Sequence, residues 1–233
     1  MKTKTIHLTP RIKPPKFANK NIGPVARHVL MTEPQRWYQT CIHEAAHAVF
    51  TYCLNGALQS DGCSVSSSDE GVAKTELYSM EPADEAVMIM AGPTAELVWL
   101  AHPSRFTRAN FRWWYENHYQ RTPGMRRTDA CDQLAIAKEL RPDDIYGIMG
   151  EWDLKVNRML KDPVIWTAII GVANRLYAQK ELEGEAVERS IIRIVKQMQA
   201  TGFPEPTKHN QLLYELRNNF KKFIHERRDQ RPY

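Results

Sequence analysis

The chain has 233 residues, of which 42% are hydrophobic, and this is enough to bury one substantial core. Its net charge of +5 is mildly basic and falls well short of the excess typical of dedicated nucleic-acid-binding proteins. No stretch is long and apolar enough to cross a bilayer, no secretory signal is evident, and the four cysteines show no paired pattern, so we expect a cytoplasmic protein that does not enter a membrane.

Residues 1–30 are predicted to be a basic, extended arm, because they contain seven lysines or arginines and no acidic residue. Too few of them are apolar for the arm to pack alone. The arm either contacts an acidic protein or a nucleic acid, or remains a solvated terminus. We therefore expect the folded domain to begin at residue 31.

The first long helix is predicted to begin after Thr32, because Thr32 and Gln35 match a capping box. Gly56 suits its end. Between these residues an apolar stripe recurs at helical spacing, as expected for a helix with one buried face.

This helix contains His43 and His47, which are four positions apart in the sequence HEAAH. On a helix this spacing places both imidazoles on one face about one turn apart, so both can bind the same ion. Glu44 lies between them, close enough to take a proton from a water bound to that ion. The motif favours a Zn²⁺ site, and the alternative is a solvated polar face of an ordinary helix.

Two further elements are predicted to lie beside the HExxH helix. Residues 63–66 and 72–78 alternate small or apolar residues with polar ones, which predicts a β-hairpin. A second helix is predicted over 82–101, where Pro93 is expected to kink or split it. On that helix, Glu96 either accepts a hydrogen bond from a ligand histidine or faces water.

Residues 104–127 form an insertion with six arginines and six aromatic side chains. This combination suits the binding of phosphates and bases, and equally a peptide-binding rim or a lid. A helical hairpin that buries its own aromatic side chains is the structural alternative.

The remaining sequence is predicted to be helical, with a turn over 183–185. The expected helices cover residues 128–140, 147–161, 163–180, 186–201 and 210–228. We therefore expect a mainly α (α+β) fold with a small hairpin, a single domain over 31–202, and a basic C-terminal helix and tail over 203–233.

Taken in order, these motifs resemble the peptidase domain of the FtsH-type zinc metalloproteases. The family's H-E-A-G-H-A helix is similar to residues 43–48, and its G-x-x-A-E helix is similar to residues 92–96. Its third metal ligand is an aspartate that opens a later helix, and residues 129–140 resemble that helix. The resemblance covers residues 35–195.

The resemblance implies that His43, His47 and Asp129 hold Zn²⁺, with Asp132 as the alternative third ligand. It implies that Glu44 acts as the general base in a metalloendopeptidase that hydrolyses peptide bonds. The family's ATPase module and membrane anchor have no counterpart in this sequence, so we expect a polypeptide substrate that is unfolded or delivered by a partner.

The alternative function is a non-catalytic regulatory or binding protein on the same scaffold. It would use the basic arm or the insertion to bind an acidic protein or a nucleic acid. Both functions are compatible with a homo-oligomer.

Overall fold

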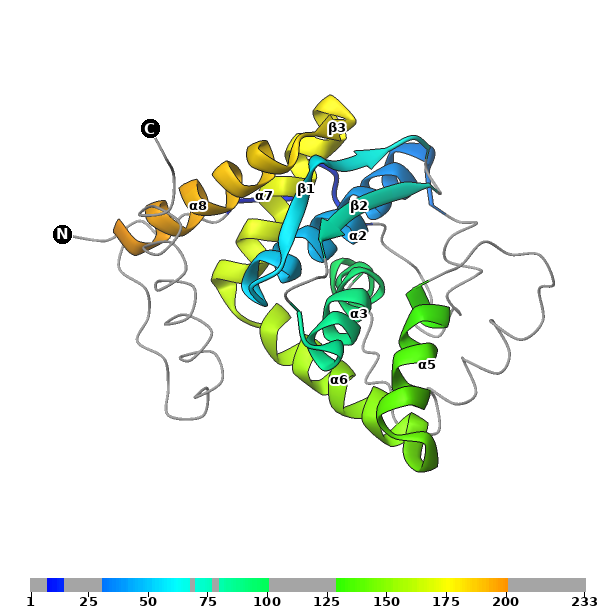
Figure 1. Ribbon diagram of the computed structural model, residues 1–233. Coiled ribbons are helices and arrows are strands. Elements are labelled where there is room, and N and C mark those ends of the chain that lie inside the picture. Colours follow the sequence, from blue (N-terminus) through cyan, green and yellow to red (C-terminus); the bar gives the residue numbers. More distant parts are fainter. Residues whose placement is uncertain (1–7, 15–30, 68–69, 77–79, 101–128, 201–233) are drawn as a thin grey trace.

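The computed structural model describes residues 8–14, 31–67, 70–76, 80–100 and 129–200. This part of the chain is mainly helical with one small antiparallel sheet, which confirms the predicted fold class. Helix α2 is central, with the sheet on one side and α3 on the other (Figure 1). In chain order the elements are α2 (Glu33–Cys53), β1 (Ala57–Val65), β2 (Gly71–Glu76), α3 (Pro82–Trp99), α5 (Asp129–Leu140), η1 (Pro142–Asp144), α6 (Ile145–Leu160), α7 (Pro163–Gln179), β3 (Glu181–Leu182) and α8 (Gly184–Ala200).

Helix α2 begins where the capping box predicts. The backbone N–H of Thr32 donates a hydrogen bond to Gln35 Oε1 at 3.0 Å. The sequence suggested Gly56 as the residue that ends the helix, but the residue with a left-handed backbone is Asn55, with a φ of 64°. The N–H of Gly56 then donates to the carbonyl oxygen of Thr51 at 2.8 Å, which closes a Schellman motif.

The predicted hairpin is present, and β1 and β2 pair antiparallel with Val65 opposite Gly71. Strand β1 is longer than predicted, because it continues past a register shift between Leu58 and Cys63. Strand β3 pairs with β1, so the strand order is β2-β1-β3 and β2 lies at an edge of this sheet. Both β1 and β2 pack against α2.

Helix α3 continues through Pro93, so of the two predicted effects of this proline the split is wrong. Proline removes one backbone hydrogen bond from a helix interior. Residues on both sides of Pro93 are buried, including Ala91, Gly92 and Ala95, and α3 packs against both α2 and α6. Tertiary packing therefore holds the helix together across the proline.

The predicted turn over 183–185 is also wrong, since α8 begins at Gly184. The helix starts early, with the N–H of Val187 bonded to the carbonyl oxygen of Glu183 at 3.0 Å. Gly184 is needed for close packing rather than for a turn, because a Cβ atom there would lie 2.2 Å from the carbonyl oxygen of Gln59. The left-handed residue lies three positions before the predicted turn, at Lys180, which has a φ of 66° and ends α7.

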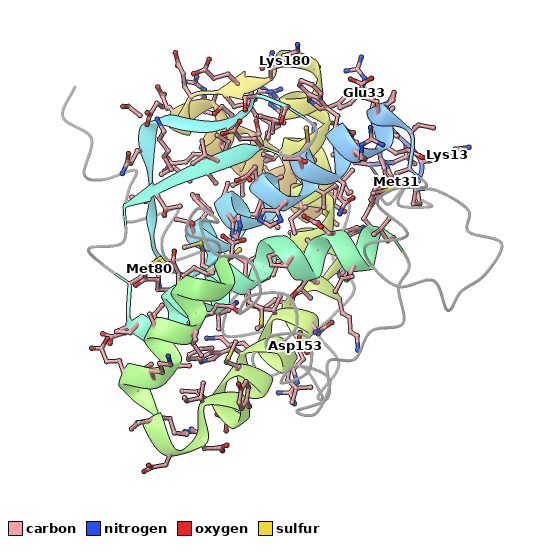
Figure 2. All side chains as sticks on the ribbon, turned by 90° about the vertical axis from the view of Figure 1, so that its right-hand side faces the viewer. Lys13, Met31, Glu33, Met80, Asp153 and Lys180 are labelled. Atoms are coloured by element: carbon pink, nitrogen blue, oxygen red, sulfur yellow. The ribbon has the colours of Figure 1, made fainter. Side chains whose placement is uncertain are left out.

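Part of the predicted N-terminal arm is attached to the domain. Within residues 8–14, the backbone N–H of Arg11 donates to Asn174 Oδ1 at 2.7 Å, and Asn174 Nδ2 donates to the carbonyl oxygen of Thr9 at 3.1 Å. Gln35 Nε2 donates to the carbonyl oxygen of Lys13 at 3.3 Å, which holds this segment beside the start of α2 (Figure 2). Hydrogen bonds between the backbone of residues 8–14 and side chains of α2 and α7 therefore hold this segment on the domain. The low apolar content of the arm did not predict these bonds.

Among the described residues, no helix combines the length and the apolar character that a membrane crossing requires. Cys41, Cys53 and Cys63 are buried free thiols. Burial raises the pKa of Cys41 and of Cys53 to about 12, so these side chains are packing residues rather than nucleophiles.

Candidate metal centre

The two histidines of the HExxH helix lie on one face of α2, as their spacing predicts. The ring centroids of His43 and His47 are 4.6 Å apart, and the rings meet edge to face. His47 is buried, whereas His43 is partly exposed. Both imidazoles therefore turn toward the same point beside the helix.

Asp129, the first residue of α5, brings a carboxylate to that point. Its Oδ2 atom lies 2.9 Å from His43 Nε2 and 3.3 Å from His47 Nε2. The potential ligand atoms of these three residues all lie within 4.8 Å of one another, and the group could hold a metal ion. Asp132, the alternative third ligand, is not part of the group found among the described residues.

The second nitrogen of each imidazole is held by a group from α3. His43 Nδ1 lies 2.6 Å from Glu96 Oε1, and His47 Nδ1 donates to the carbonyl oxygen of Met88 at 2.9 Å. Glu96 also accepts a hydrogen bond from Gln39, one turn before His43. The sequence predicted that Glu96 either bonds to a ligand histidine or faces water, and the structure shows the bond to His43. Such partners fix the ring orientation and direct both Nε2 atoms toward the centre.

Glu44 is almost completely buried beside this cluster, with 6% of its surface exposed. Burial raises the pKa of its carboxyl group, and the neighbouring His43 and His47 partly oppose that shift. A carboxyl group with a raised pKa takes up a proton more readily than an exposed one, which suits proton transfer near neutral pH.

The charges of the cluster are coupled. Burial lowers the pKa of His43, but hydrogen bonds to Asp129 and Glu96 outweigh it and raise the pKa well above its usual value. Burial raises the pKa of Asp129, but the two imidazoles outweigh it and hold the pKa below its usual range. A divalent cation would compete with the proton shared between His43 and Asp129.

Two glycines let neighbouring elements approach the cluster closely. A Cβ atom on Gly92 of α3 would lie 2.5 Å from His47 Nε2 and 2.6 Å from His43 Nε2. Glycine at position 92 thus leaves out a side chain that would collide with both Nε2 atoms. Gly71 of β2 approaches Glu44 in a similar way. The sequence did not predict these two roles, because they depend on contacts across the fold.

One of the two distances between Asp129 and the imidazoles fits a bound zinc ion. Zn²⁺ bound to nitrogen and oxygen at about 2.0–2.1 Å in a tetrahedron separates its ligand atoms by about 3.3 Å. The distance of 3.3 Å between His47 Nε2 and Asp129 Oδ2 agrees with this value, whereas the 2.9 Å from His43 Nε2 is that of a hydrogen bond. Two nitrogens and one carboxylate oxygen are also a donor set that divalent transition metals accept.

Several predicted regions lie outside the described residues. They are the insertion over 104–127, most of the arm over 1–30, and the C-terminal helix and tail over 203–233. Binding of an acidic protein or a nucleic acid by these segments stays a prediction.

Comparison of the chain with protein-family models, with curated proteins and with solved structures finds no match in any of the three. The resemblance to FtsH-type peptidases therefore stays a prediction from the motifs. The geometry by itself assigns a candidate metal centre made of His43, His47 and Asp129.

Proposed function

We propose that the protein is a zinc-dependent metalloendopeptidase, similar to the FtsH-type peptidases in its HExxH helix and aspartate ligand. The observation that carries the proposal is the convergence of His43, His47 and Asp129 within 4.8 Å, with Glu44 buried next to them. Two histidines and one carboxylate leave room for a further ligand in a four-coordinate site, which is the arrangement of catalytic rather than structural zinc.

Zinc is the proposed ion because imidazole nitrogen and carboxylate oxygen are common zinc ligands. A bound Zn²⁺ supplies Lewis acidity, which polarises a substrate carbonyl and lowers the pKa of a coordinated water from 15.7 toward about 7. The chain supplies the orientation of the ligands. Glu96 and the carbonyl group of Met88 hold the two Nδ1 atoms, which would leave both Nε2 atoms available to a bound ion.

Glu44 is the proposed general base. Its carboxylate takes a proton from the attacking water and returns it to the leaving amine of the cleaved peptide bond. Burial keeps this carboxylate out of bulk water. Burial also raises the pKa of the carboxyl group, so the carboxylate binds a proton more tightly than an exposed glutamate does.

The sheet supports a polypeptide as the substrate. Strand β2 is an edge strand among the described strands, and its first residue, Gly71, contacts Glu44. An extended peptide that pairs with such an edge would pass next to the general base. Because a peptide must be extended to pair in this way, we expect a substrate that is unfolded or that a partner delivers.

The test combines metal analysis with cleavage of casein. Wild-type protein should contain about one zinc ion per chain and cleave casein. Glu44→Gln should retain zinc and lose activity by a factor of about 10² to 10⁴, as expected when a general base is removed. His43→Ala should lose both zinc and activity.

Two results would overturn the proposal. Glu44→Gln protein that cleaves casein as fast as wild type would exclude Glu44 as the base. A zinc-loaded wild type without hydrolysis of casein or of itself would favour the regulatory or binding function instead. Binding to phosphate groups would then be recognised by its steep loss as the salt concentration rises.

A further inference from the structure

Strand β2 passes so close to Glu44 that there is no room for a side chain at position 71. A Cβ atom on Gly71 would lie 2.6 Å from Glu44 Cγ and 2.8 Å from Glu44 Oε1. Real Cβ atoms essentially never approach other atoms closer than 3.0 Å. Gly71 does not have a positive φ angle, so the glycine is required for space and not for its backbone conformation.

The strand is fixed where it makes this contact. Gly71 lies opposite Val65 in the antiparallel ladder between β1 and β2. Just before it, the carbonyl oxygen of Glu70 accepts a hydrogen bond from the N–H of Ser66 at 2.9 Å. Strand β2 therefore cannot move away from α2 without disturbing the hairpin, and the Glu44 side chain is confined between the strand and its own helix.

We propose that Gly71 is a positioning residue for Glu44, and that its lack of a side chain lets β2 hold the carboxylate of the general base against the metal centre. The role of Glu44 as a base rests on the proposed function. The packing contact itself does not, so the two ideas fail separately.

An alanine at position 71 would displace Glu44 and leave the metal ligands in place. The three atoms nearest to the added Cβ all belong to Glu44, and reaching ordinary contact at 3.4 Å requires a shift of about 0.8 Å from 2.6 Å. A misplacement of about 1 Å in a catalytic group can lower the rate by about 100-fold. We expect this loss in kcat, with zinc content unchanged.

The contact can be tested without metal and without activity. Gly71→Ala is introduced into the wild type and into Glu44→Ala, and the urea midpoints of the four metal-free proteins are compared. Alanine at position 44 has no Cγ or Oε1, so the clash should vanish. We expect Gly71→Ala to lower the midpoint in the wild-type background and to leave it unchanged in the Glu44→Ala background.

Gly150→Ala is the matched control, because a Cβ atom at position 150 would meet no atom within 4 Å. Its effect should be the same in both backgrounds. Equal shifts for Gly71→Ala in the two backgrounds would overturn the inference. If Gly71→Ala alone does not fold, a folded Gly71→Ala/Glu44→Ala protein supports the contact and an unfolded one contradicts it.

The kinetic measurement uses the zinc-loaded proteins. Gly71→Ala with wild-type zinc content and about 100-fold lower kcat on casein supports the positioning role. Wild-type kcat in this variant would refute it. If the wild type itself does not cleave casein, the proposed function fails, and the urea midpoints still decide whether Gly71 confines Glu44.

Discussion

Substitution of Gly92 by alanine should weaken metal binding strongly while leaving the fold intact. The added Cβ atom would lie 2.5 Å from His47 Nε2 and 2.6 Å from His43 Nε2, the two atoms that would bind the ion. Neither ring can move away freely, because its Nδ1 atom is held, by Glu96 at 2.6 Å for His43 and by the Met88 carbonyl group at 2.9 Å for His47. The methyl group would therefore occupy the space of the metal ion or rotate the rings out of position.

The size of the effect follows from these distances. Ordinary contact at 3.4 Å requires displacements of about 0.9 Å from 2.5 Å, several times the tolerance of about 0.2 Å in metal–ligand distances. Loss of a single supporting group already weakens metal binding by about 10- to 100-fold. We expect Gly92→Ala to weaken zinc binding by at least about 100-fold, or about 2.7 kcal/mol. Metal-free stability should change less, because alanine favours the helix by about 1 kcal/mol and so offsets part of the clash.

Zinc affinity is measured by competition with a chromogenic chelator, and the zinc-induced rise in Tm by thermal unfolding. Gly150→Ala is again the control, because Gly150 also lies inside a helix and has open space at its Cβ position. This control should bind zinc like the wild type. Wild-type zinc affinity in Gly92→Ala would refute the assignment of the metal centre to the two Nε2 atoms.

Three further predictions follow from the contacts. Glu96→Ala should weaken zinc binding by about 10- to 100-fold, measured by the same competition, because His43 Nδ1 loses its partner; unchanged affinity would contradict this role. Burial raises the pKa of Asp153 from 3.8 to about 7. Between these two pH values the folded protein keeps a proton on Asp153 that the unfolded chain has lost, so the stability of the wild type should fall as the pH rises. In urea unfolding across this range, Asp153→Asn should become more stable than wild type by up to about 4 kcal/mol at pH 8, and parallel pH profiles would exclude the shift. Asn174→Ala should lower the free energy of unfolding by about 1–3 kcal/mol, because the backbone N–H of Arg11 and the hydroxyl of Tyr38 both lose their acceptor, and deletion of residues 8–14 should reduce this difference but not abolish it.

Local features of the fold follow from the sequence. The period of 3.6 residues places His43 and His47 together on any helix, and the capping pattern at Thr32 marks where that helix begins. Alternation of small and polar residues predicted the hairpin. These features depend on residues a few positions apart, so a sequence pattern is enough to find them.

The tertiary structure decided the rest. Packing keeps α3 continuous through Pro93, although proline disfavours a helix interior. It also lets α8 begin at Gly184, where the sequence predicted a turn. Asp129 lies 86 positions from His43, so no local pattern links the two residues, and the family resemblance that pointed to Asp129 left Asp132 as an alternative. The role of Gly71 was equally hidden, because it depends on how closely β2 passes α2. A metal centre requires atoms from separate elements to meet within a few ångströms, and only the packing of those elements fixes such distances.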